Sequence, residues 1–194
     1  MNGYAFKSED YQENGLRLLR TKNFSEKGYA EVLSDDVFVP DEFWDEYKKY
    51  RCELFDFHLV MVGASVGKTS YALSNMMPCL RNQNMWCFRP KIKGTRFFVN
   101  LATEKKVSEV MGWASGSART FFKKGDFQKH TVVYPSDELA KEFSTLVEPL
   151  YKKYDLNVKE NQTLAALRDT LLPKLISGEL RVAPTTEPLK EAVG

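Results

Sequence analysis

The sequence contains no glycine from residue 136 to about residue 177. Apolar side chains recur in this stretch at seven-residue steps, and the positions at its centre, Asn157 among them, are polar. This spacing predicts one long helix, or two in sequence, with an apolar seam that needs a partner. The seam consists of Leu139, Phe143, Leu146, Leu150, Leu164, Leu167 and Leu171. We expect an intermolecular or intersubunit helix, although packing on its own domain is the alternative.

Proline and glycine suggest where this helix changes course. We expect a kink at Pro149, an interruption at Asp155–Asn157 and a stop at Ser177–Gly178. The sequence therefore predicts a globular part over residues 1–135, a helical spacer or dimerisation region over residues 136–178 and a flexible tail over residues 179–194.

The first 135 residues have a different texture. Short apolar stretches broken by glycine and Asp-Asp pairs predict β-structure up to residue 40, followed by a short helix over Asp41–Arg51. Further strands are expected in ELFDFHLVMVG, around Met85 to Pro90 and in HTVVYP, with a helix from Arg96 to about Met111. The predicted fold class is α+β: a β-rich globular domain with short helices, then a long coiled-coil-type helix.

The stretch GASVGKTS, Gly63 to Ser70, resembles a phosphate-binding P-loop at first sight. A P-loop needs four residues between its glycines and a helix after it, so that several N–H groups and the helix dipole face the phosphates. Here only three residues separate Gly63 from Gly67, and the sequence that follows predicts strand, turn and strand. A nucleotide-binding protein stays an alternative interpretation, and the simplest one is a tight turn with a solvated lysine.

Charge is distributed unevenly along the chain. Residues 57–135 hold 12 Lys and Arg against 3 Asp and Glu, whereas residues 1–56 hold 8 against 13. A basic segment in a chain with a net charge of +2 indicates a polyanionic partner, because clustered cations displace counterions from phosphates. A solvated basic face is the alternative.

Composition limits the remaining classes of protein. The three cysteines form no C-x-x-C pair, which favours a reduced, cytoplasmic protein without a zinc site. No apolar run approaches a membrane span, and the polar start MNGYAFKSED predicts no signal peptide. We expect no cofactor, no metal and no catalytic residues, since the sequence has neither a [DN]-P-P-[YFW] motif nor a defensible nucleophile–histidine–acid set.

Residues 160–182, ENQTLAALRDTLLPKLISGELRV, closely resemble the C-terminal signature of the DNA-specificity subunit of type I restriction–modification systems. Upstream segments stand in the order and spacing of a target recognition domain from that family. They are YAFKSEDYQENGLRLLRTKN, FVPDEFWDEYKKYR, HLVMVGASVGK, LRNQNMWCFRP and ASGSART. The resemblance covers nearly the whole chain.

The resemblance implies a non-catalytic subunit that binds double-stranded DNA. In that family, each of two recognition domains reads half of a split target, and two long helices pair, space the domains and dock methyltransferase subunits. This chain is similar to one half. It starts later than family members usually do, so we expect either a truncated second half or a half-subunit that forms a homodimer or pairs with a second half. Two-fold pairing predicts a palindromic, interrupted target.

Polar and basic positions of the globular part are the candidate DNA contacts. Arginine pairs bidentately with guanine, and asparagine and glutamine pair with adenine, so Arg81, Asn82 and Gln83 are expected to read bases. The full set is Lys22, Asn23, Lys68, Thr69, Ser70, Arg81, Asn82, Gln83, Ser117, Arg119, Lys123 and Lys124. A purely structural helical assembly module is the remaining alternative function.

Overall fold

The computed structural model describes residues 1–113 and 124–181. The chain divides into two compact units, Met1–Asp155 (unit 1) and Leu156–Gly194 (unit 2). Unit 1 holds two small sheets and short helices, and a long helix follows in the sequence, so the predicted α+β fold class is confirmed. The boundary at residue 135 stays a prediction, and most of the predicted tail lies outside the described residues.

The first sheet has the strand order β2-β1-β5. Strand β1 (Leu16–Leu19) pairs antiparallel with β2 (Phe38–Val39) and parallel with β5 (Cys79–Arg81). In the parallel pair Leu19 lies opposite Arg81. Both strands therefore end at the same edge of the sheet.

The second sheet has the order β4-β3-β6 and is antiparallel throughout. Its central strand β3 (Asp56–Val60) is buried at every position, as the apolar sequence around it predicts. Strand β4 (Thr69–Ala72) follows the Gly63–Lys68 turn, and β6 (Met85–Phe88) follows β5 after a short turn. The predicted strand, turn and strand after the P-loop-like stretch are thus confirmed.

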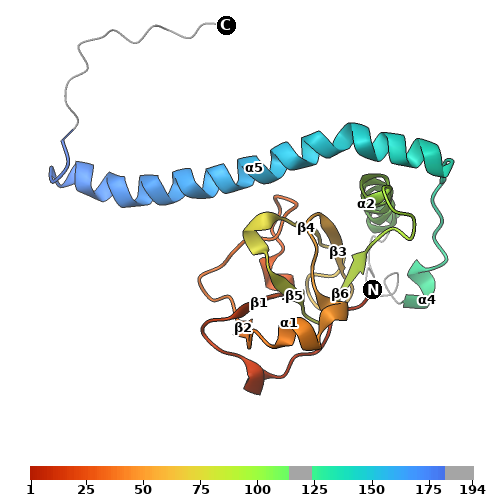
Figure 1. Cartoon of the computed structure of the whole chain (residues 1–194), viewed down its shortest axis with the longest axis horizontal. Helices are drawn as coiled ribbons and strands as arrows, with labels where there is room; N and C mark the ends of the chain where they lie inside the picture. Colours follow the sequence, from red (N-terminus) through yellow and green to blue (C-terminus); the bar gives the residue numbers. More distant parts are fainter. Residues whose placement is uncertain (114–123, 182–194) are drawn as a thin grey trace, which may run out of the picture. The chain divides into compact units, whose positions relative to one another are not determined.

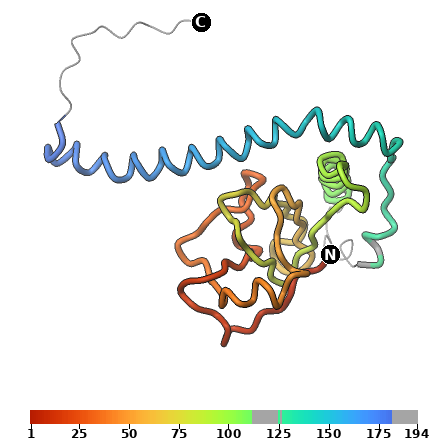
Figure 2. Tube along the Cα trace, in the orientation of Figure 1, coloured from red at the N-terminus to blue at the C-terminus, as the bar shows by residue number. Residues whose placement is uncertain are grey.

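Helices cover these sheets on the apolar sides. Helix α2 (Arg96–Trp113) packs Val107 and Val110 with Leu59 of β3, and α1 (Phe43–Glu46) packs against the first sheet (Figure 1). The shorter elements are η1 (Ser8–Asp10), η2 (Thr21–Asn23), η3 (Lys48–Tyr50), η4 (Ser74–Met76) and α4 (Lys124–Phe127). The chain begins beside β6, where the amino group of Met1 donates to the Cys87 carbonyl at 2.7 Å (Figure 2).

Helix α5 (Asp137–Ile176) is continuous over Pro149 and over Asp155–Asn157, so the expected interruption was wrong. Its first part belongs to unit 1. There the Asp155 carboxylate accepts hydrogen bonds from the backbone N–H and the hydroxyl of Ser74, at 2.8 and 2.7 Å. Ser144 Oγ accepts one from the Phe98 N–H at 3.1 Å. The polar stretch at Asp155 predicts a break in the helix. The hydrogen bonds from Ser74 instead make Asp155 part of the packing of unit 1.

Two further predictions were wrong in detail. The helix expected over Asp41–Arg51 is divided into α1 and η3, because Tyr47 between them leaves the helical region at φ −104° and ψ 38°. HTVVYP, residues 130–135, forms no strand, and its Val133 side chain is 93% exposed. No helix within residues 1–113 and 124–181 is both long and apolar enough to cross a bilayer.

Candidate nucleic-acid interface

A polar cleft of about 180 Å³ lies where β1 and β5 end. Because the two strands run parallel, the residues after each of them meet at one edge of the sheet. The backbone N–H of Asn82 donates to the Leu19 carbonyl at 2.9 Å and fixes this arrangement. The cleft is lined by Arg20, Thr21, Lys22, Asn82, Gln83 and Asn84. Two segments that the sequence separates by sixty residues thus form one surface.

The basic side of the cleft is only loosely neutralised. Lys22 forms an exposed ion pair with Asp35, and this ammonium holds the pKa of Asp35 below its usual range. The guanidinium of Arg20 donates to the Asp35 carbonyl at 2.7 Å. Exposed ion pairs contribute about 0–1 kcal/mol, so a phosphate can replace Asp35 as the partner of Lys22.

The other side of the cleft is the turn between β5 and β6. The side-chain oxygen of Asn82 accepts a hydrogen bond from the Gln83 N–H at 2.8 Å, and Asn84 has a positive φ of 72°. Asparagine tolerates this left-handed conformation better than most residues. The turn is therefore locally held, while the side chains of Gln83 and Asn84 are exposed.

Three predicted contact residues at the cleft are buried, namely Asn82, whose side-chain oxygen holds the turn, and Asn23 and Arg81 beside it. The Asn23 side chain accepts from the Arg20 N–H and donates to the Glu31 carbonyl, both at 2.9 Å. Arg81 is 0% exposed, and its guanidinium donates to the backbone carbonyls of Asn2, Arg51 and Lys49. In this conformation the side chains of Asn23 and Arg81 hold the backbone of the cleft and present no group to a base.

The P-loop-like stretch closes on itself. The N–H groups of Val66, Gly67 and Lys68 donate to the carbonyls of Gly63, Val60 and Ser65 at 3.3, 3.0 and 3.0 Å. Backbone N–H groups are the main phosphate ligands of a P-loop. Since these three are already used in the turn between β3 and β4, the nucleotide-binding alternative is not supported.

Lys68 and Thr69 line a separate cavity of about 400 Å³ that also contains Glu26 and Glu104. The Lys68 ammonium pairs with Glu26 at 2.5 Å, and Glu104 accepts a hydrogen bond from the Tyr71 hydroxyl at 2.9 Å. Ser70 is buried within β4. Two carboxylates near one lysine make this cavity a weaker anion site than the cleft.

The third predicted region is mostly outside the described residues. Ser117, Arg119 and Lys123 lie there, and Lys124 begins α4 with a side chain that is not described.

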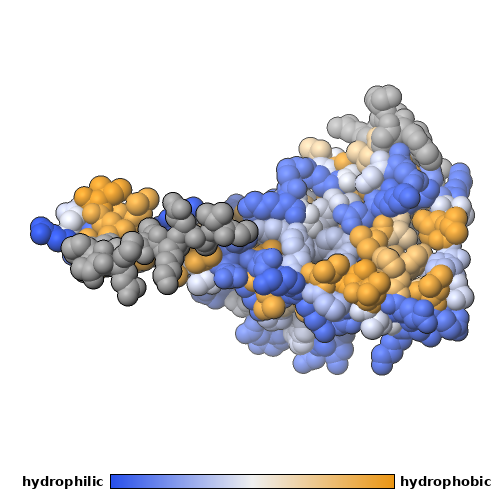
Figure 3. Space-filling view, turned by 90° about the horizontal axis from the view of Figure 1, so that it is seen from above, coloured by the Kyte–Doolittle hydropathy of each residue, from blue (hydrophilic) through white to orange (hydrophobic). Residues whose placement is uncertain are grey.

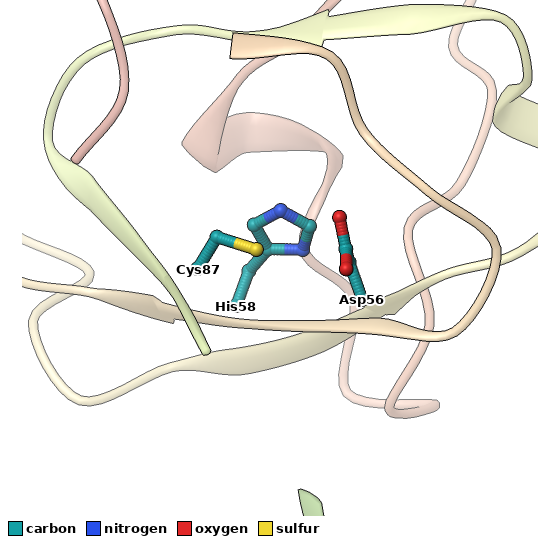
Figure 4. A group of neighbouring side chains, drawn as sticks. All are labelled: Asp56, His58 and Cys87. Carbon is teal, nitrogen blue, oxygen red and sulfur yellow. The ribbon is translucent and has the colours of Figure 1, made fainter. Parts of the chain in front are cut away.

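All three cysteines are buried, and two lie near His58. Donor atoms of Asp56, His58 and Cys87 lie within 4.8 Å of one another, and Figure 4 shows these side chains side by side. Burial, and secondarily Asp56, raises the pKa of the Cys87 thiol to about 12, so it is protonated near neutral pH. A protonated thiol is a poor metal ligand.

Asp56 itself is fully engaged. Its carboxylate accepts from Arg89 Nε at 2.8 Å, from Arg96 at 3.0 Å and from the Glu53 N–H at 2.8 Å. The positive charges of Arg89 and Arg96 at these distances also disfavour the binding of a metal cation. We therefore interpret the group in Figure 4 as a buried polar part of the core.

The predicted seam of α5 is exposed along its length. Leu146 and Leu150 are 76% and 69% exposed, although leucine is normally buried. The remaining exposed members are Leu139, Phe143, Leu164, Leu167 and Leu171. Two exposed apolar stretches, separated by the polar centre of the seam, are typical of an interaction surface.

Sequence reasoning missed Arg20 as part of the cleft and the apolar side chains around Val133. Arg20 looked like the end of a strand, and only the parallel pairing of β1 with β5 places it beside Asn82.

Comparison with known proteins gives two findings. A family model described as type I restriction modification DNA specificity domain matches residues 10–166. The specificity subunit of the type I restriction enzyme MjaIX, from Methanocaldococcus jannaschii, is 31% identical over 86 residues. The matched stretch spans 44% of this chain and 20% of that relative.

Proposed function

The chain belongs to the family of type I restriction modification DNA specificity domains, and on this premise we propose that it recognises DNA for a type I restriction–modification complex. Unit 1 reads one half of a bipartite target, and α5 pairs with a second half and docks methyltransferase subunits. Methylation and cleavage belong to the partner subunits.

The cleft at the ends of β1 and β5 carries this proposal. It places cations, Arg20 and Lys22, against exposed amides, Gln83 and Asn84. Phosphate contacts position a protein on the duplex, whereas amide and guanidinium contacts to base edges distinguish sequences. We assign Lys22 and Arg20 to phosphates and the turn at Gln83–Asn84 to bases. We propose further contacts to the DNA phosphate backbone from Lys68, Thr69 and the segment from Ser117 to Lys124.

The seam also favours one arrangement of two copies. In antiparallel coiled coils, the two kinds of seam position face each other. An antiparallel pair centred on Asp155 places Leu139 opposite Leu171, Phe143 opposite Leu167 and Leu146 opposite Leu164. The polar positions Lys153 and Asn157 then meet at the centre. A two-fold pair of this kind presents two identical reading surfaces and requires an inverted, interrupted target.

Fluorescence anisotropy tests DNA binding, with the chain assembled with methyltransferase subunits and titrated with duplex DNA at two salt concentrations. Each phosphate contact contributes a slope of about −0.9 to the dependence of log affinity on log salt. Binding that falls steeply with salt supports the proposal, and binding that ignores salt overturns it. In the same assay, Lys22→Ala tests the phosphate contact assigned to Lys22. Its matched control is Lys27→Ala, because Lys27 is also an exposed lysine paired with one carboxylate, Glu31.

A further inference from the structure

Unit 1 contains an apolar groove of about 430 Å³ that the DNA-reading surface does not use. Phe98 and Leu101 of α2 form one wall, Val132 and Val133 before α5 form another, and Phe143 of α5 closes it. Val133 is 93% exposed, and apolar side chains gather at the right of Figure 3, where α5 begins. An exposed apolar patch of this kind indicates a binding surface.

The groove is continuous with the proposed helix seam. Phe143 belongs to both, because it lines the groove and is a seam position that faces Leu167 in the antiparallel register. A helix that packs on the seam at Phe143 therefore has one flank beside the groove.

The flank in question can be identified from heptad spacing. In the first part of α5, the side that packs into unit 1 contains Ser144, bonded to the Phe98 N–H, and Tyr151, stacked on Phe97 at 4.4 Å. Whole numbers of heptads from these residues lead to Leu172. The same count from Tyr154, which donates to the Lys27 carbonyl at 2.8 Å, leads to Leu175. Leu172 and Leu175 thus occupy the same heptad positions as the residues that contact unit 1, and both are apolar and exposed.

We propose that the groove of one copy receives Leu172 and Leu175 from the α5 helix of a second copy. The inference rests on the antiparallel pairing proposed above. In that two-fold pair both recognition domains lie on the same side of the helices, and each is alongside the end of the partner helix. One side of α5 therefore contacts its own domain in the N-terminal part of the helix. The same side faces the domain of the second copy in the C-terminal part.

The register supports this placement independently of the flank. Leu172 of one copy falls opposite Glu138 near the start of α5 in the other, and Leu175 lies beyond that start, toward the segment with Val132 and Val133. The contact would fix the angle between each domain and the paired helices, and hence the spacing between the two reading surfaces.

Disulfide cross-linking of the full chain tests the contact. The double variant Val133→Cys with Leu175→Cys should form a covalent dimer under mild oxidation, whereas either single variant and the pair Val62→Cys with Leu175→Cys should not. Val62 is a suitable control because it is exposed and apolar but lies in the turn after β3. The pair Leu146→Cys with Leu164→Cys reports the seam separately.

The outcomes separate this inference from the proposed function. Cross-linking through both pairs supports the groove contact. A seam cross-link without a groove cross-link overturns the groove contact and leaves the antiparallel pairing intact. A chain that sediments as a monomer and cross-links through neither pair overturns both. If Val133→Asp leaves dimerisation unchanged but abolishes binding of the methyltransferase subunit, that subunit occupies the groove and the inference is wrong.

Discussion

At the residue scale, Asp56 shows how the chain places charge inside its core. Burial alone raises the pKa of Asp56, but the Arg89 guanidinium, helped by His58 and the Glu53 N–H, outweighs burial and holds it below its usual range. A carboxyl with a lowered pKa stabilises the fold above its unfolded pKa of about 3.9, and this stability is lost as pH falls through the folded value.

Asp56→Asn should therefore lower the free energy of unfolding by about 3–5 kcal/mol near pH 7, since it leaves Arg89 and Arg96 without their buried counter-charge. The difference from the unmodified chain should narrow below about pH 4, where Asp56 begins to protonate in the unfolded chain, and further as pH falls through the lowered pKa of the folded chain. Urea denaturation near pH 7 and below about pH 4 measures the free energy of unfolding of both chains and so tests both effects. Asp45→Asn, at a carboxylate that is 80% exposed, should change stability little at either pH.

The thiols give a second prediction at this scale. Burial, and then Cys79, raises the pKa of Cys52, and the pKa of Cys87 is raised to about 12. Alkylation needs an accessible thiolate. A thiol reagent at pH 8 should label none of the three cysteines in the folded chain and all three in denaturant. Rapid labelling of the folded chain would contradict the buried placement.

Gln83 and Lys22 should behave differently when they are changed. Gln83→Ala should weaken binding to the preferred half-site by about 1–3 kcal/mol and relax the choice of base at one position. Lys22→Ala should weaken binding to all sequences alike and lower the salt slope by about 0.9. Anisotropy titrations with a set of single-base variants of the target distinguish these patterns, and identical patterns for the two variants would refute the division of roles.

Sequence alone identified the polarity of these residues but not their accessibility. Arg81 and Gln83 look like equivalent base-reading candidates in RNQN, yet one is buried under backbone carbonyls and the other is exposed at the turn. Which side of a short strand faces the core depends on its partner strand, and the β1–β5 pairing joins residues far apart in the chain.

At the scale of elements, the sequence pattern predicted secondary structure best where one helix face is repeated over many turns. Forty residues of heptad spacing predicted α5 closely, because each turn repeats the same signal. HTVVYP has strand composition but pairs with no strand in the described part of the chain, and composition alone does not reveal a pairing partner. The strand order of the sheets could not be predicted from the sequence either, since it depends on contacts between distant segments.

The seam of α5 gives a prediction for this scale. Leu146→Asp combined with Leu164→Asp should weaken self-association at least about 100-fold, because each leucine buried on pairing contributes about 1.5–3 kcal/mol and both copies lose it. Sedimentation over a concentration series measures the dissociation constant. Val62→Asp adds a charge at an exposed apolar residue outside the seam and should leave association unchanged. Equal effects of the two changes would argue against a specific seam.

At the scale of the whole molecule, we propose that a reading cleft is joined to a helix that sets the distance between two such clefts. Neither part is sufficient alone, because a single cleft with a few contacts specifies only a short sequence. In the proposed pair, the two-fold symmetry rather than any further residue would determine the form of the DNA target.

Selection of preferred sites from random duplexes, with the chain assembled with its methyltransferase subunits, tests whether two clefts read one target. We expect two identical half-sites in inverted orientation, separated by a spacer of fixed length and arbitrary sequence. A single uninterrupted site without symmetry, or no sequence preference at all, would contradict this expectation.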